Sequence, residues 1–124
     1  IISVVHLAQL FLKHLRPGGG MVFLSSTAAL SPNGRYATYS ASKAAVNAFA
    51  QALARNRPEL NFYTICPGPT NTTMREKIGD DAAKSQSPEA VASVVADLIG
   101  GTTTYKSGDI IIVRDGAVSK AGGF

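Results

Sequence analysis

Three short, uninterrupted apolar runs do most to restrict how this 124-residue chain can fold. They are Met21–Leu24, Phe62–Cys66 and Ile110–Val113, and glycine, proline or serine residues lie close to their ends. A short run without polar alternation is typical of a strand buried on both faces. Such strands occur in parallel sheets covered by helices, so the runs predict an α/β fold.

Helical patterns alternate with these strands. Residues 3–15 carry apolar side chains at helical spacing, and residues 41–54 form an alanine-rich stretch typical of a closely packed helix. The two apolar stripes are Val4, Leu7, Ala8, Phe11 and Leu15, and Val46, Phe49, Ala50 and Leu53. Pro17 with the glycines that follow it ends the first helix, and Pro58 ends the second.

A third predicted helix has clear start and stop signals. Ser87 supplies a capping hydroxyl, Pro88 stands at the first helical position, and Glu89 places a carboxylate near the positive end of the helix. Gly100 and Gly101 end it. Its buried stripe is predicted to be Val91, Val94, Val95, Leu98 and Ile99.

The resulting order of elements is helix, strand, helix, strand, helix, strand. It predicts a single domain over residues 1–124, with about three parallel strands and covering helices. Residues 71–86 are polar and without periodicity, which indicates a surface loop or a flap over a site. The residues after Asp115-Gly116 are expected to form a tail.

Composition and charge exclude several classes of protein. With 45% hydrophobic and 16% charged residues, the chain has the balance of a globular protein, and no apolar run approaches the roughly 20 residues that span a bilayer. The net charge of +4 comes from Lys and Arg residues without a cluster, so no nucleic acid and no membrane is expected as a partner. The single cysteine, Cys66, cannot form an internal disulfide, which favours the cytoplasm.

The start of the chain has neither the charged region nor the cleavage site of a signal peptide. It begins with Ile1 rather than Met, so we expect the chain to begin inside a longer protein.

Residues able to do chemistry gather where the predicted strands end. Ligands of open parallel sheets bind beyond the carboxyl ends of the strands. The first strand ends at Ser25 and Ser26, and small or hydroxyl-bearing residues follow the second at positions 67–72. Tyr39 and Lys43 are four residues apart at the start of the second helix, so their side chains lie on one face, one turn apart.

The Tyr39–Lys43 pair suits acid/base chemistry. A phenol is a poor base at neutral pH, but an ammonium nearby favours the phenolate, and the positive end of the helix acts in the same direction. A hydroxyl opposite, such as that of Ser26, would hydrogen-bond the substrate oxygen whose proton Tyr39 gives or takes. The motif alone is weak, because four tyrosines and six lysines predict roughly 0.2 chance matches to Tyr-x-x-x-Lys.

Its context strengthens it, because these residues together resemble the short-chain dehydrogenase/reductase family. The strand ending in Ser25-Ser26 and the segment Tyr39-Ser40-Ala41-Ser42-Lys43 are similar to the family's active-site motifs. The resemblance extends over nearly the whole chain. The resemblance implies Ser26 as the residue that orients the substrate and Tyr39 as the general acid/base. Lys43 would assist Tyr39 and hold the nicotinamide ribose.

The resemblance also implies a nicotinamide cofactor, NAD or NADP. Besides Tyr39 and Lys43, the implied cofactor-binding residues are Pro67, Gly68, Thr70 and Thr72, in the family's proline-glycine turn. The implied reaction is reversible hydride transfer between the nicotinamide and the carbon of a carbonyl or alcohol substrate. No metal ligand is implied.

The family's nucleotide-binding motif has no counterpart in this chain. Gly18-Gly19-Gly20 lies between a helix and a strand, the reverse of the strand-to-helix order that points amides at a pyrophosphate, so it is interpreted as a turn. The family's catalytic asparagine should fall at or just before Ile1. The expected fold is therefore the C-terminal, catalytic half of a Rossmann-like doubly wound sheet, with the nucleotide-binding half absent.

The sequence offers little support for a metal site or a serine hydrolase. His6 and His14 lack partners at metal-ligand spacing, and no Gly-x-Ser-x-Gly elbow supports a serine hydrolase. The alternative to a catalytic fragment is a truncated, non-catalytic protein that serves as an oligomerisation or interaction module. In both cases the resemblance implies a homo-oligomer formed through the helices at residues 3–15 and 41–54.

Overall fold

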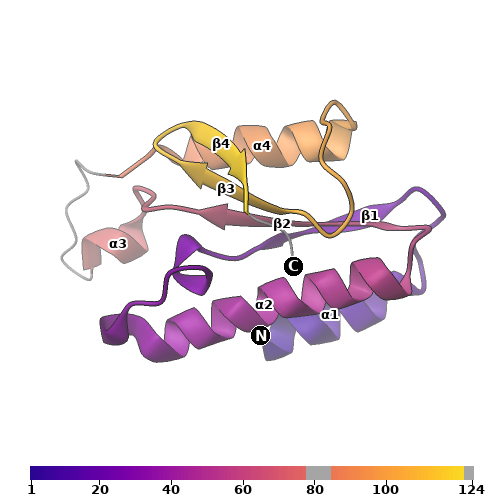
Figure 1. Cartoon of the computed structure of the whole chain (residues 1–124), viewed down its shortest axis with the longest axis horizontal. Helices are drawn as coiled ribbons and strands as arrows, with labels where there is room; N and C mark the ends of the chain where they lie inside the picture. Colours follow the sequence, from indigo (N-terminus) through magenta and orange to yellow (C-terminus); the bar gives the residue numbers. More distant parts are fainter. Residues whose placement is uncertain (78–84, 122–124) are drawn as a thin grey trace.

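The structure of the protein, a computed structural model, describes residues 1–77 and 85–121. Figure 1 shows helices above and below a twisted sheet. In chain order the described elements are the helix α1 (Ile2–Leu12), the strand β1 (Gly20–Leu24), the 3-10 turns η1 (Thr27–Ala29) and η2 (Gly34–Tyr36), the helix α2 (Ala37–Asn56), the strand β2 (Asn61–Pro67), the helices α3 (Thr73–Lys77) and α4 (Pro88–Gly100), and the strands β3 (Ile110–Arg114) and β4 (Ala117–Lys120).

The sheet has four strands in the order β1-β2-β3-β4. β1, β2 and β3 are parallel, with Leu24 opposite Ile65 and Ile65 opposite Ile111, so the three predicted parallel strands are confirmed. The predicted tail is wrong, because residues 117–120 form β4, antiparallel to β3. Asp115 and Gly116 have φ of 52° and 74°, the left-handed pair that suits a two-residue hairpin turn.

Helices cover both faces of the sheet and enclose two separate cores (Figure 1). α1 and α2 lie side by side on one face, and α4 lies on the other. The first core joins Ala8, Val46 and Ala50 to Phe23, Leu60 and Phe62. The second joins Val94 and Leu98 to Ile65, Ile111 and Val113. The observed architecture is thus an α/β fold with a mixed, mostly parallel sheet.

β1 lies at an edge of the described sheet, and its burial differs from the prediction. Phe23 is buried between the sheet and α2, whereas Leu24 is 54% exposed. Burial on both faces was therefore a wrong expectation for this strand. An edge strand has a neighbour on one side only, so its terminal side chains have less protein around them than Ile65 or Ile111 in the interior of the sheet, both at 0% exposure.

The apolar stripe predicted for α1 is split between the core and the surface. Ala8 is buried and Val4 and Leu15 pack against the first core, but Leu7 and Phe11 are 55% and 56% exposed. The buried line runs at intervals of four residues through Ala8, so positions 7 and 11 lie about 100° away around the helix.

Of the other two long helices, α2 differs from prediction at its start, and α4 differs at Ile99, which was predicted to be buried but is 76% exposed. α2 begins at Ala37, four residues before the predicted Ala41. α4 runs from Pro88 to Gly100 as predicted, and Gly101 caps it with a left-handed φ of 69°. Ser87 occupies the capping position, but its side chain makes no capping hydrogen bond, contrary to prediction. Its backbone oxygen instead accepts a bond from the N–H of Ala90 at 3.2 Å.

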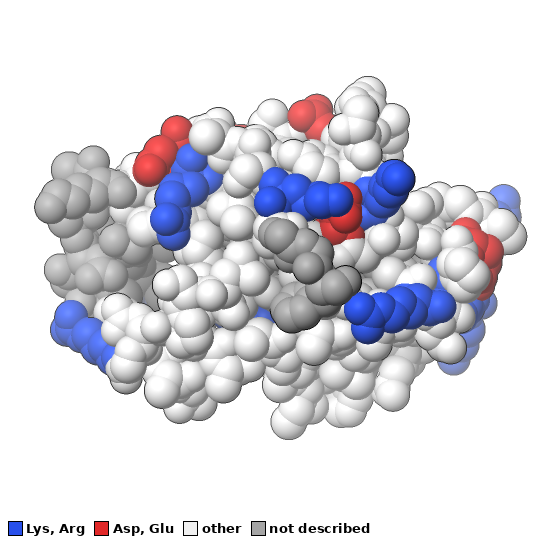
Figure 2. Space-filling view, in the orientation of Figure 1, with Lys and Arg blue, Asp and Glu red and all other residues white. Residues whose placement is uncertain are grey.

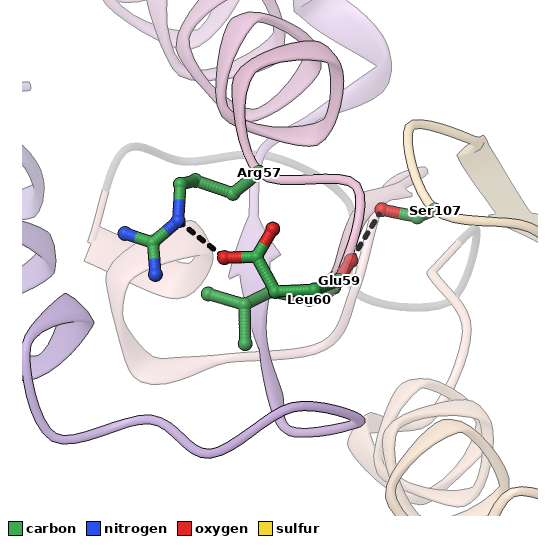
Figure 3. A network of polar contacts seen from close by, with 4 residues as sticks. All are labelled: Arg57, Glu59, Leu60 and Ser107. Atoms are coloured by element: carbon green, nitrogen blue, oxygen red, sulfur yellow. Dashed lines mark hydrogen bonds and ion pairs between the residues drawn. The ribbon is translucent and has the colours of Figure 1, made fainter.

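A network of polar contacts lies at the amino end of β2, where Figure 3 shows Arg57, Glu59, Leu60 and Ser107. The N–H of Phe62 donates to Ser107 Oγ at 3.0 Å, and the Ser107 hydroxyl donates to the carbonyl of Leu60 at 3.3 Å. Beside them Arg57 pairs with Glu59 at 2.5 Å, and this hydrogen bond lowers the pKa of the Glu59 carboxyl. The ion pair is exposed and adds little stability. Ser107 links β2 to the segment before β3 together with the backbone bond from the N–H of Gly108 to the carbonyl of Phe62 at 2.7 Å.

Between β2 and α4 the described chain contains the short helix α3 and one isolated bridge, between Thr70 and Gln86. The predicted polar loop at residues 71–86 is thus described in part, and residues 78–84 lie outside the described residues. No helix in residues 1–77 or 85–121 combines the length and the apolar character needed to cross a membrane.

Candidate active site

The start of α2 brings the predicted catalytic pair together at the carboxyl end of β1. Tyr39 lies in the first turn of α2 and is 41% exposed, and Lys43 follows one turn later. The Lys43 ammonium is 5.8 Å from the centroid of the Tyr39 ring and donates a hydrogen bond to the carbonyl of Leu24 at 3.2 Å. The last residue of β1 therefore holds Lys43 over Tyr39.

The two serines after β1 have different surroundings. Ser26 follows the strand, and its hydroxyl oxygen accepts a hydrogen bond from the N–H of Ala28 at 3.1 Å, capping η1. A hydroxyl that accepts in this way keeps its own proton for donation. Figure 1 shows η1 close to the start of α2, so Ser26 and Tyr39 come from neighbouring segments, although no described hydrogen bond joins them.

Ser25 is a residue of the site that the sequence reasoning did not single out. It is 5% exposed, and its hydroxyl donates to the carbonyl oxygen of Lys43 at 3.0 Å. Together with the Leu24 carbonyl, it ties both ends of Lys43 to the end of β1. A serine that points inward at a strand end is the signal that would have identified it, but its partner is 18 residues away in the sequence.

A buried polar cluster continues below this pair. The Cys66 thiol, fully buried in β2, donates to Asn47 Oδ1 at 3.8 Å, and Asn47 lies one turn after Lys43 on α2. Burial raises the pKa of the Cys66 thiol, and hydrogen bonds with Ser25 and Asn47 offset part of that effect. Cys66 therefore links β2 to α2 through its contact with Asn47.

We expect the Cys66 thiol to react with Ellman's reagent at pH 8 roughly 100-fold more slowly in the folded chain than in urea, because reaction requires local opening. Burial raises the pKa of the Cys66 thiol in the folded chain, so the protonated thiol stabilises the fold. This stabilisation is fully present below the pKa of an exposed thiol and is lost as the pH rises through the pKa of Cys66 in the folded chain. The labelling rate and the urea midpoint between pH 7 and pH 10 check both statements. Equal labelling rates with and without urea would contradict the first statement, and a urea midpoint that does not fall as the pH rises would contradict the second.

The proline-glycine turn follows β2 at the same edge of the sheet. Pro67 is the last residue of β2, and the N–H of Gly68 donates to the carbonyl of Val113 at 2.8 Å. A side chain at Gly68 would lie 3.3 Å from Cγ of Arg114, so the close approach to β3 favours glycine there. The turn is consequently packed against the end of β3.

The two threonines of this turn are in different situations. The Thr70 hydroxyl donates to the carbonyl of Gly68 at 2.9 Å and accepts from Nε2 of Gln86 at 3.4 Å. Thr72 is exposed and directly precedes α3. The hydroxyl of Thr70 is thus tied to Gly68 and Gln86.

Gln86 is a second residue that the sequence reasoning missed. It is 7% exposed, and its Nε2 donates to the carbonyl of Val113 at 2.7 Å while its Oε1 accepts from the N–H of Gly116 at 3.4 Å. A glutamine inside a polar segment carries no sequence signal for burial. The role of Gln86 becomes visible only in the structure, where residues 85–86 lie beside the ends of β2 and β3.

The donors at this edge fit the nicotinamide and ribose end of a dinucleotide. Of the three N–H donors of Lys43, one is used by Leu24 among the described residues, and the exposed Tyr39 hydroxyl lies beside it. The glycines before β1 do not fit the pyrophosphate, since they lie at the opposite end of that strand. The N–H of Gly18 donates to Glu59 and that of Gly19 to Arg16, as expected for a turn.

A hollow of about 530 Å³ opens between η1 and the hairpin of β3 and β4. Thr27, Leu30, Ile112 and Arg114 are among its lining residues, and none of the predicted site residues is. It borders the candidate active site, because Thr27 directly follows Ser26 and Arg114 approaches Gly68. On the face in Figure 2, basic side chains lie in several separate places among uncharged and acidic ones.

The comparisons with known proteins agree with this arrangement. The model of the family described as short chain dehydrogenase matches residues 1–83. The chain belongs to the short-chain dehydrogenase family. The match includes the Ser25-Ser26 strand end, the Tyr39–Lys43 helix and the turn after β2. Within the described ranges, no group of three or more His, Cys, Asp or Glu side chains is placed to hold a metal ion.

Curated relatives of this short-chain dehydrogenase match most of its length. Dehydrogenase/reductase SDR family member 4 of Bos taurus is 30% identical over 118 residues, covering 84% of this chain and 42% of the relative. The benzil reductase ((S)-benzoin forming) of Saccharomyces cerevisiae is 36% identical over 80 residues, covering 63% of this chain and 30% of the relative. The chain thus spans less than half the length of these two relatives.

Solved structures of short-chain dehydrogenases share the fold. One from Brucella melitensis superposes with a TM-score of 0.83 at 26% identity, over 92% of this chain and 51% of that structure. One from Shigella flexneri, complexed with NADP, superposes with a TM-score of 0.79 at 27% identity, over 90% of this chain and 48% of that structure.

Proposed function

We propose that this chain carries the catalytic residues of an NAD- or NADP-dependent oxidoreductase that interconverts carbonyl and alcohol substrates. The observation that supports it most is the arrangement at the start of α2, where the Lys43 ammonium lies over the exposed Tyr39 ring and is held by the Leu24 carbonyl. An exposed phenol beside a fixed cation suits proton transfer to a bound small molecule.

In this proposal each residue has a defined part in the reaction. Ser26 donates its hydroxyl proton in a hydrogen bond to the substrate oxygen and so orients the carbonyl. Tyr39 gives its phenolic proton to that oxygen during reduction and takes it back during oxidation. Lys43 stabilises the phenolate that remains and hydrogen-bonds the ribose. The nicotinamide, when bound, supplies or accepts the hydride.

We also propose that the chain is the C-terminal, catalytic portion of a longer protein, whose other part binds the rest of the nucleotide. Two observations support this proposal. The chain spans less than half the length of the Bos taurus and Saccharomyces cerevisiae relatives, and the glycines before β1 form a turn. The NADP in the Shigella flexneri structure makes NADP the first cofactor to test, with NAD beside it. We also propose that the protein is cytoplasmic, because its single cysteine is a free thiol.

The test uses this chain joined to the N-terminal half of the Bos taurus relative, here called the joined protein. Oxidation of NADPH and NADH is followed at 340 nm with a panel of aldehydes and ketones, and cofactor binding is followed by fluorescence. We expect saturable binding and turnover by the joined protein, and neither by the 124-residue chain alone. A folded joined protein that binds cofactor but reduces no member of the panel would overturn the proposal.

The alternative, a non-catalytic association module, is favoured by a specific observation on α1. Its outer face exposes Ile2, Leu7, Leu10 and Phe11, at 71%, 55%, 56% and 56%. On α2 beside it the exposed residues include Ala41, Ala44, Ala48 and Ala52, a line of small side chains that permits close helix packing. This surface supports a homo-oligomer formed through residues 3–15 and 41–54, with or without catalysis.

We expect Leu10→Glu to convert an oligomer of this chain into monomers, because it places a charge in the apolar face of α1. Ile99→Glu on α4 is the matched control, since Ile99 is 76% exposed on the opposite face of the sheet and should leave association unchanged. Sedimentation velocity of the wild type and both variants measures the effect. A wild type that stays monomeric at high concentration, or equal effects of both substitutions, would rule out this surface.

A further inference from the structure

We propose that Gln86 is a positioning residue that holds the Pro67–Thr70 turn against the end of β3, and so sets where the turn meets the cofactor. The role in cofactor binding rests on the proposed function. The role in holding the turn rests on the contacts of Gln86 alone. Gln86 touches no reacting group and would act through the turn.

The side-chain amide of Gln86 joins the turn after β2 to the end of β3 and to the hairpin turn that follows β3. Nε2 donates to the carbonyl of Val113 in β3 at 2.7 Å and to the Thr70 hydroxyl at 3.4 Å. Oε1 accepts from the N–H of Gly116 in the hairpin turn at 3.4 Å. Both ends of a buried amide are therefore used, as burial requires.

The backbone of Gln86 adds two further bonds to the same turn. Its N–H donates to the carbonyl of Pro69 at 2.8 Å, and its carbonyl accepts from the N–H of Asn71 at 2.9 Å. The backbone thus pairs with the turn like a short strand, while the side chain reaches past it to β3. Two independent sets of contacts fix the turn from the side of α4.

The contacts form a closed ring of hydrogen bonds around Gly68. The Val113 carbonyl accepts from both Gln86 and the N–H of Gly68, and the Thr70 hydroxyl accepts from Gln86 while donating to the Gly68 carbonyl. The Thr70 hydroxyl therefore donates its one proton to a carbonyl of the same chain. Thr70 then acts as a member of this ring, rather than as the direct cofactor contact that the family resemblance implies.

Three variants separate the effect of the ring from general stability. Gln86→Met keeps the length of the side chain and removes its three hydrogen bonds, to Val113, Thr70 and Gly116. Thr70→Val removes the hydroxyl, whereas Thr70→Ser keeps it and is the matched control. The first two should loosen the turn, and Thr70→Ser should behave as the wild type.

Backbone amide exchange of the 124-residue chain tests the ring without any enzyme activity. We expect Gln86→Met and Thr70→Val to speed exchange of the Gly68 N–H roughly tenfold. The Ser25 N–H, which donates to Ile65 between β1 and β2 at 2.8 Å, is the internal reference and should change less than twofold. Equal acceleration at Gly68 and Ser25, or none at Gly68, would overturn the proposal.

Kinetics of the joined protein test the link to the cofactor. We expect Gln86→Met to raise the KM for the nicotinamide cofactor roughly tenfold with less than a twofold change in kcat. A fall in kcat without a rise in KM would overturn the link to the cofactor. If the wild-type joined protein is inactive, the proposed function fails, while the exchange result still decides whether Gln86 holds the turn.

Discussion

Tyr39→Phe is expected to lower the rate of carbonyl reduction by the joined protein roughly 100-fold to 10,000-fold, because it removes the group that gives the proton to the substrate oxygen. The ring and its packing stay, so the Lys43 ammonium keeps its place near the ring and at the Leu24 carbonyl. The measurement is kcat with the best carbonyl of the panel, at saturating cofactor.

Tyr36→Phe is the matched control, because it makes the same change three residues earlier. Tyr36 lies under Arg35, whose guanidinium carbon is 5.9 Å from the ring centroid, and no proton transfer is assigned to it. We expect its kcat to stay within about twofold of the wild type. Cofactor fluorescence should report binding by both variants. Wild-type turnover in Tyr39→Phe would refute the assignment of Tyr39 as the acid.

Ile65→Ala is expected to lower the free energy of unfolding of the chain by about 2–5 kcal/mol, because it opens a cavity in the second core. Ile65 is 0% exposed and packs with Ile111, Val113 and the buried face of α4. A loss of this size is a large part of the total stability of a small domain. Urea unfolding followed by circular dichroism measures it.

Ile99→Ala makes the same substitution on the exposed face of α4. Ile99 is 76% exposed, and alanine is the better helix former, so we expect a change within about 0.5 kcal/mol. Equal losses for the two substitutions would mean that the second core is not arranged as described.

The secondary structure was largely predictable because its signals are local. The apolar runs at residues 21–24, 62–66 and 110–113 lie within the three parallel strands, and Gly101 ends α4 as predicted. The hairpin was missed because Asp115-Gly116 fits the end of a strand as well as a turn between two strands. The choice depends on whether residues 117–120 find β3 beside them.

The candidate site was predictable only where its residues share one helix. Tyr39 and Lys43 are brought together by helical spacing, so their proximity follows from the sequence. Their roles, and those of Ser26, Pro67, Gly68 and Thr72, stay predictions. The partners of Ser25 and Gln86 lie far away along the chain or in a segment without periodicity, and no local pattern identifies them.

By itself, the sequence determined where strands and helices form and that a phenol and an ammonium lie one turn apart, because hydrophobic periodicity and helical spacing act over a few residues. The tertiary structure alone decided that β1 lies at an edge, that Leu7 and Phe11 face outward, and that Gln86 joins the turn to β3. Each of these depends on which distant segment comes to lie beside a residue, and packing of the whole sheet with its helices settles that.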